Sequence, residues 1–251
     1  MSRKVTVLAL LVGSLALACT EGTGPAFDEG LTDAAPVLQA GIHHLQWPAA
    51  DTPQQFTVAG GTPETQILLA EAVSSSGGYT LDNYQVSFWA VKGRDRAVQI
   101  NYVQEFQTFG LTWDDSYSKT VASPYLRFTV PARALDEGPN GEEYSYGDSV
   151  LITITIDPTD MVAHYEPAGL RFDEDYPATL QVWYTGANGD YDSDGDVDKY
   201  DSYIEANLLG MWWQQDPAHP WYRLPAVQSL TERWFRSELR HFSGYAVSWQ
   251  E

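Results

Sequence analysis

An acidic stretch at residues 190–201 has the residue types and spacing of a calcium-binding loop. Oxygen-bearing side chains stand at loop positions 1, 3, 5, 9 and 12, with glycine at position 6 and an apolar residue at position 8. Gly195 permits the sharp turn, and Val197 is expected to anchor the loop to a core. We predict a Ca²⁺ site here; the alternative is a solvated acidic turn. The candidate ligands are Asp190, Asp192, Asp194, Asp198 and Asp201, with the backbone carbonyl of Asp196.

The N-terminal residues indicate export. Residues 1–18 have the form of a signal peptide, with Arg3 and Lys4 before an apolar run and small residues after it. Cys19 follows Leu-Ala-Leu-Ala, which resembles the lipobox of bacterial lipoproteins. This resemblance implies cleavage before Cys19, a lipid on its sulfur, and a location at the outer membrane or cell surface. In that family, an Asp directly after the Cys marks retention at the inner membrane. Thr20 stands at that position here, so we expect sorting to the outer membrane or cell surface.

Composition narrows the possible partners. The chain has 34 acidic and 14 basic residues, a net charge of −20. Such a surface repels phosphate backbones, which argues against nucleic-acid binding. Cys19 is the only cysteine in the 251 residues, so no disulfide is available and the core must stabilise the fold.

The pattern along the chain predicts one all-β domain, an antiparallel β-sandwich. We expect a flexible tether over residues 19–53 and a sandwich over residues 54–251. Residues 84–91, 97–103 and 150–156 alternate between apolar and polar, and residues 92–95 are expected to join the first two as a hairpin. Further strands are expected at residues 54–58, 66–73, 125–130, 179–184, 209–214, 221–224, 233–240 and 242–249. The one helical pattern covers residues 199–208.

Three stretches in the second half of the chain carry a family resemblance. They are Val-Pro-Ala-Arg-Ala-Leu at 130–135, Glu-Pro-Ala-Gly-Leu-Arg-Phe at 166–172 and the closing stretch at 241–247. Over residues 124–249 the chain resembles the ZU-five domain of ankyrins, netrin receptors and bacterial surface lipoproteins, and this resemblance implies a β-sandwich used for protein contacts. Residues 186–207 are an insertion relative to that family. The acidic loop inside it resembles one dockerin half-repeat more than a helix-loop-helix EF-hand, because Asp201 replaces the usual Glu and a strand precedes the loop. Dockerins need two such repeats, so the resemblance does not imply cohesin binding.

Enzymatic alternatives have weaker support in the sequence. His241-Phe242-Ser243 resembles the self-cleavage site of some ZU-five relatives, where Ser243 would attack the preceding carbonyl with help from His241. No Gly-x-Ser-x-Gly elbow, phosphate-binding loop or His-Glu-x-x-His motif is present. We therefore expect a protein that is not an enzyme, with autoproteolysis between Phe242 and Ser243 as an alternative.

Abundant aromatic residues allow a second alternative, carbohydrate binding. Aromatic faces can stack on sugar rings, although most tryptophans in strands are expected to pack in the core. The test is whether several of them lie exposed together on one sheet face. The candidates are Trp89, Trp183, Trp212, Trp213, Trp221 and Trp234.

These patterns together predict a non-enzymatic, calcium-stabilised lipoprotein of the cell envelope. It is expected to act as a protein-interaction or adhesion module, anchored to the membrane through Cys19, with a protein or glycan partner. Ca²⁺ is the one expected cofactor.

Overall fold

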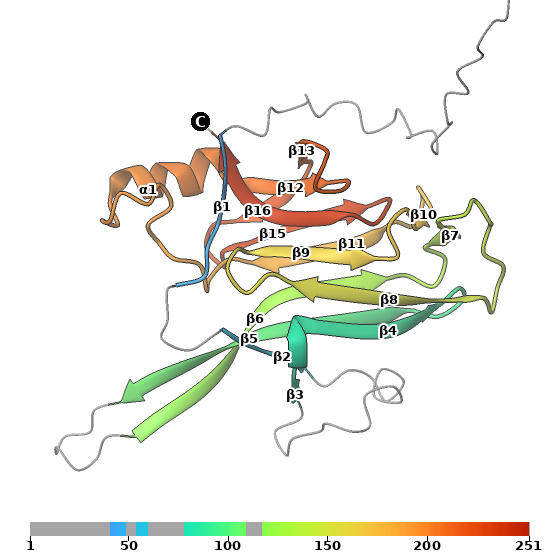
Figure 1. Cartoon of the computed structure of the whole chain (residues 1–251), viewed down its shortest axis with the longest axis horizontal. Helices are drawn as coiled ribbons and strands as arrows, with labels where there is room; N and C mark the ends of the chain where they lie inside the picture. The colour runs from blue at the N-terminus through green and yellow to red at the C-terminus, as the bar shows by residue number, and fades with distance from the viewer. Residues whose placement is uncertain (1–40, 49–53, 60–77, 109–116, 251) are drawn as a thin grey trace, which may run out of the picture. The chain divides into compact units, whose positions relative to one another are not determined.

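The computed structural model shows an all-β protein with antiparallel sheets and one short α-helix, as the sequence predicts (Figure 1). The structure describes residues 41–48, 54–59, 78–108 and 117–250, all within one unit that spans Ala34–Glu251. The predictions for residues 1–40, including Cys19, and for a strand at residues 66–73 lie outside the described residues. In the described part of the chain, no helix has the length and apolar character to cross a membrane.

The first sheet has the strand order β13-β12-β16-β9-β8-β4, and β1 also pairs with β16. All pairings in it are antiparallel. Because β16 pairs with β12 on one side and with β9 and β1 on the other, the last strand of the chain is an interior strand. The members of this sheet are β1 (Ile42–His44), β4 (Gln85–Val91), β8 (Ser149–Ile156), β9 (Val162–Glu166), β12 (Gly210–Gln214), β13 (Trp221–Leu224) and β16 (Gly244–Gln250).

The second sheet has the order β14-β15-β11-β6-β5-β2-β3. The long strands β5 and β6 pair over their whole length, with an irregularity between Ile100 and Asn101. A separate two-stranded sheet joins β7 (Leu135–Glu137) to β10 (Arg171–Phe172). The members of the second sheet are β2 (Gln55–Ala59), β3 (Gly78–Thr80), β5 (Arg96–Thr108), β6 (Tyr117–Val130), β11 (Ala178–Trp183), β14 (Val227–Ser229) and β15 (Trp234–Leu239).

Alternation along the strands produces the core. In β8, Ile152, Ile154 and Ile156 are fully buried, whereas the threonines between them face outward. Burying each such side chain stabilises the fold by about 1.5–3 kcal/mol relative to exposure. β4 and β11 show the same alternation, so each sheet has one apolar face in the main hydrophobic cluster.

The predicted hairpin at residues 92–95 is wrong. The turn exists, but β4 pairs with β8 in the first sheet and β5 pairs with β6 and β2 in the second. The Arg96 Nε donates to the Trp89 carbonyl oxygen at 3.3 Å, and the Gly93 amide donates to the carbonyl of Ala132 at 2.6 Å. Both strands bury one face in the sandwich whether they pair or not, so their alternation is the same in a hairpin and in an arch between sheets.

Residues that precede the predicted domain boundary at residue 54 belong to the sandwich. β1 pairs with the end of β16, with Ile42 opposite Gln250 and His44 opposite Ser248. Leu45 and Trp47 are buried in the main core. The folded part of the predicted tether therefore includes residues 42–47.

Candidate functional site

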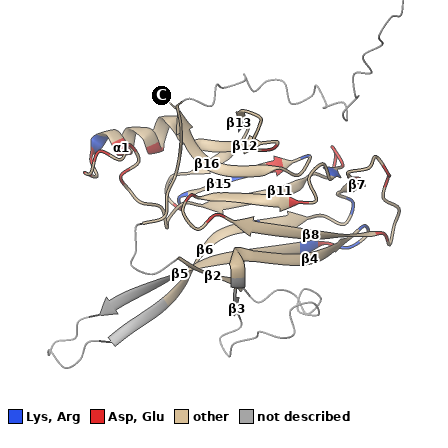
Figure 2. Cartoon of the chain, viewed as in Figure 1, with Lys and Arg blue, Asp and Glu red and all other residues tan. Residues whose placement is uncertain are grey.

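The acidic loop connects the second sheet to the helix at the edge of the domain. It begins after β11 and leads into α1 (Lys199–Tyr203), which continues as the π-helical turn η4 (Ile204–Leu208) and then β12. The chain turns sharply at Ser193 and Gly195, whose φ angles are 60° and 100°. The positive φ at position 195 is a conformation that favours glycine, as the loop pattern predicts. Asp and Glu residues are frequent in the loop that leads into α1 and in the loops around β7 (Figure 2).

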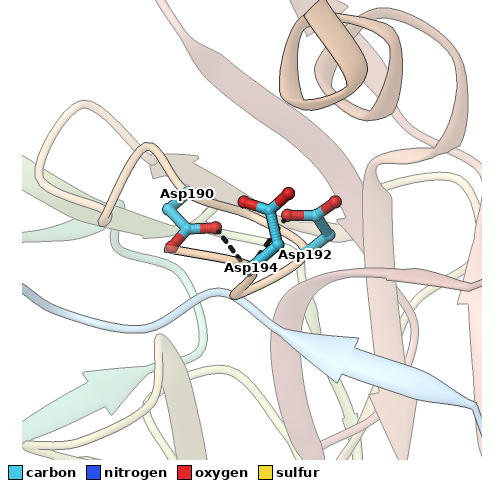
Figure 3. Close-up of side chains that lie close together, drawn as sticks. All are labelled: Asp190, Asp192 and Asp194. Atoms are coloured by element: carbon cyan, nitrogen blue, oxygen red, sulfur yellow. Dashed lines mark hydrogen bonds between the residues drawn. The ribbon is translucent and has the colours of Figure 1, made fainter. Parts of the chain in front are cut away.

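Three of the predicted ligands converge. One carboxylate oxygen from each of Asp190, Asp192 and Asp194 lies within 4.8 Å of the others (Figure 3). The Asp190 carboxylate accepts hydrogen bonds from the amides of Asp194 at 3.1 Å and Gly195 at 2.9 Å. Desolvation, with the charge of Asp194 as a smaller cause, raises the pKa of Asp192. A group of hard oxygen donors this close together fits a cation such as Ca²⁺.

Asp198 and Asp201 connect the loop to the helix. Asp198 is the N-cap of α1, and its Oδ1 accepts from the Tyr200 amide at 2.6 Å. Asp201 is 3% exposed, and its two oxygens accept from the amides of Tyr191 at 2.6 Å and Asp198 at 2.7 Å. Asp201 therefore joins both ends of the loop to the first turn of the helix. Asp196, whose carbonyl is the sixth predicted ligand, is exposed.

The prediction that Val197 anchors the loop to a core is wrong, because this residue is 72% exposed. Tyr191 and Ile204 are the buried apolar residues of this region, at 6% and 0% exposure. Tyr200 and Tyr203 belong to the apolar pattern that predicts the helix, yet they point outward with near-parallel rings whose centroids are 6.1 Å apart. An exposed aromatic surface therefore adjoins the acidic loop.

A polar network that the sequence pattern does not reveal holds the loop against the sandwich. Arg233 donates from Nε to Glu205 Oε1 at 3.1 Å and from its terminal nitrogen to the Tyr191 hydroxyl. The Tyr191 carbonyl accepts from the indole of Trp249 at 3.0 Å. Tyr191 occupies position 2 of the loop, which is not a ligand position, and Arg233 lies far along the chain. The one sequence signal for this network is Tyr191, an aromatic residue between two aspartates.

The structure does not join His241 to Ser243 as a catalytic pair. The Ser243 hydroxyl is buried, and among the described residues it makes no hydrogen bond to His241. Phe242 packs in the core against Phe128, Tyr165 and Phe172. Burial lowers the pKa of His241, whose ring lies 4.7 Å from that of Trp213. Self-cleavage stays a prediction, and an intact-mass measurement of the purified protein tests it.

A different serine and histidine are hydrogen-bonded. His44 Nδ1 lies 2.7 Å from Ser248 Oγ, on neighbouring strands β1 and β16. Burial lowers the pKa of His44, and the charges of Asp160 and Asp157 oppose that shift. Ser248 is 0% exposed, so its hydroxyl lies out of reach of a substrate. This pair belongs to the strand contact between β1 and β16.

The six candidate tryptophans separate into three groups. Trp212 and Trp221 are buried in a second apolar cluster with Val162 and Ala246, and they cannot form a sugar platform. Trp89 is exposed on β4, and Trp213 stacks on Tyr222 of β13. Trp183 and Trp234 lie directly opposite each other on β11 and β15.

Comparison with known proteins gives no assignment: no family model, no curated protein and no solved structure matches this chain. The resemblances to the ZU-five domain and to a dockerin loop therefore stay predictions.

Proposed function

We propose that this chain is a non-enzymatic, calcium-stabilised binding module of the cell envelope, which contacts a partner protein beside its acidic loop. The observation that carries the proposal is the convergence of three carboxylates within 4.8 Å on a loop whose ends are joined by the buried Asp201. Asp190, Asp192 and Asp194 would hold the ion, and Asp198, Asp201 and the Asp196 carbonyl would complete its oxygen shell. In this proposal a lipid on Cys19 anchors the module at the outer membrane or cell surface.

In this proposal calcium stabilises the loop and has no catalytic role. Three neighbouring carboxylates repel one another, and a bound cation offsets that repulsion. The same loop leads directly into α1. Val197 in the loop is 72% exposed, and Tyr200 and Tyr203 in α1 are 42% and 51% exposed. Tyrosines are common at the centres of protein interfaces. Ordering of the loop therefore supports a contact surface made by these three side chains.

Thermal unfolding in millimolar CaCl₂ and in EDTA tests the calcium site. We expect a higher Tm in calcium, and we expect Asp192→Asn with Asp194→Asn to abolish the difference. Asparagine keeps an acceptor oxygen at each position but removes the charge. Asp196→Asn is the matched control, because its backbone carbonyl is unchanged. An unchanged Tm together with no calorimetric heat at millimolar calcium would refute the site.

The protein contact requires a separate experiment. Protein that is captured from the cell envelope by the wild type in calcium should be lost with Tyr200→Ser and Tyr203→Ser. The same loss should follow addition of EDTA. Equal capture by the wild type and the double variant would exclude this surface as the contact.

A further inference from the structure

The outer face of the second sheet carries a row of long polar side chains. The row crosses the neighbouring strands β15, β11, β6 and β5, whose order can be followed in Figure 1. Arg236 on β15 lies opposite Gln181 on β11, Gln181 lies opposite Arg127 on β6, and Arg127 lies opposite Gln99 on β5. Both arginines are exposed, and both glutamines are half-buried. Four strands at the usual spacing make this row about 14 Å long.

Two tryptophans stand beside the row. Trp183 and Trp234 are opposite each other, one pleat along β11 and β15 from Gln181 and Arg236. Both are partly exposed, and the guanidinium carbon of Arg236 lies 5.8 Å from the centroid of the Trp234 ring. Side chains opposite each other on antiparallel strands have Cβ atoms about 5 Å apart. The two indoles are therefore neighbours across the strand pair, and the guanidinium of Arg236 lies beside one of them.

The charges on this face differ from those of the whole chain. Although acidic residues outnumber basic ones by 34 to 14, the cross-strand neighbours of Arg127 are both glutamines. Arg236 lies between Gln181 and Val227. In the described part of the chain, no ion pair involves either arginine. Exposed acids on β15 and beside it are Glu238 and Glu232, and Glu232 accepts from the Trp234 indole.

We propose that this face binds an acidic polysaccharide, with sugar rings on Trp183 and Trp234 and carboxylates on Arg127 and Arg236. Aromatic faces accept the apolar face of a sugar ring, and guanidinium groups bind carboxylates through paired, charge-assisted hydrogen bonds. The amides of Gln181 and Gln99 can donate to and accept from hydroxyl groups. Charges farther than about 8 Å from this face are screened at physiological ionic strength, so the net charge of −20 does not by itself exclude a polyanion.

This site uses no residue of the calcium-dependent contact proposed above, neither in the acidic loop nor in α1. Binding should therefore persist in EDTA. Titrations in EDTA also avoid gelation of polyuronates by calcium, so the two proposals can fail separately.

Isothermal titration calorimetry with sodium polygalacturonate in EDTA tests the proposal. We expect binding by the wild type and a loss of at least about tenfold in affinity with Arg127→Gln, because the variant loses a charge-assisted hydrogen bond to a carboxylate. Trp183→Thr should weaken binding as well, with a residue that suits a strand. Arg94→Gln, in the turn after β4, and Trp89→Thr, on the first sheet, are the matched controls and should bind like the wild type.

Two comparison polymers show whether the ligand class is right. Carboxyl-reduced polygalacturonate, which keeps the sugar rings without the charges, should bind at least about tenfold more weakly. Polyglutamate, which keeps the charges without sugar rings, should also bind weakly. Equal binding of either polymer, no binding of polygalacturonate, or equal effects of Arg127→Gln and Arg94→Gln would overturn the proposal. Circular dichroism of each variant separates a lost ligand contact from a lost fold.

Discussion

At the scale of single residues, burial rather than sequence context decides what the ionisable side chains do. His44 and His241 both have lowered pKa values because their rings are desolvated. An unfolded chain lets these rings reach water, so in the unfolded state they bind protons at a higher pH. Their contribution to stability is therefore complete above the unfolded pKa, and it is lost as pH falls below that value.

A pH series measures this contribution. The Tm of the wild type should fall between pH 7.5 and pH 5.5, with His241→Gln showing a smaller fall. The slope from one histidine is at most about 1.4 kcal/mol per pH unit. Phe242→Leu is the control, because it removes core contacts without a titrating group and should lower Tm equally at both pH values. A slope that is the same in the wild type and in His241→Gln would contradict the assignment.

At the scale of elements, the loop and α1 form one unit that is closed by Asp201. Its carboxylate reaches Tyr191 at the start of the loop and Asp198 at the start of the helix, with both oxygens engaged. Asparagine has one acceptor oxygen and an amide group that would face a backbone N–H. The buried carboxylate of Asp201 therefore fixes both ends of the loop.

Asp201→Asn should lower the free energy of unfolding by about 1.5–3 kcal/mol in EDTA, the value of a hydrogen bond to a charged group. Urea unfolding measures the loss, and hydrogen exchange should localise it to the loop and α1. Asp196→Asn, at an exposed position, should leave both unchanged. If the two variants unfold alike, Asp201 does not close the loop.

Several of these features were predictable from the sequence, and the others depend on contacts between distant residues. The alternation of β4, β8 and β11 predicts strands because each has one core face. Strands of two or three residues, such as β7, β10 and β14, are too short to show a period. The ligand spacing identifies Asp190, Asp192 and Asp194, but the interior role of Asp201 depends on where the helix packs. From the sequence alone, Trp212 and Trp221 are as good candidates for carbohydrate binding as the other tryptophans. Only the structure shows that an apolar cluster buries them.

At the scale of the whole molecule, Trp47 links the N-terminal segment to the second sheet. Its ring packs against Phe56, Tyr102 and Tyr125, which come from β2, β5 and β6. The preceding strand β1 pairs with β16 of the first sheet. One short segment therefore contacts both layers of the sandwich.

Two substitutions at Trp47 should differ sharply in their effect on the free energy of unfolding. The indole Nε1 is buried without a hydrogen-bond partner in the described structure. Trp47→Phe removes that polar group and keeps an aromatic ring, so the change in the free energy of unfolding should be small, below about 1.5 kcal/mol. Trp47→Ala should cost about 3–5 kcal/mol, because it leaves a large cavity. Urea unfolding of both variants checks the contrast, and equal losses would show that packing of the ring is not what matters.

The interior position of β16 has a consequence for how the chain reaches its fold. β16 is the last strand, yet β12, β9 and β1 all need it as a partner, and Ile42 pairs with Gln250 across nearly the whole sequence. Closing contacts of such high sequence separation is slow, since the entropy of loop closure is lost before the contacts form. Until β16 is in place, β9 and β12 lack the strand that joins them in the first sheet. We expect a chain that lacks β16 to have an incomplete first sheet, because β9 and β12 would lose their shared neighbour.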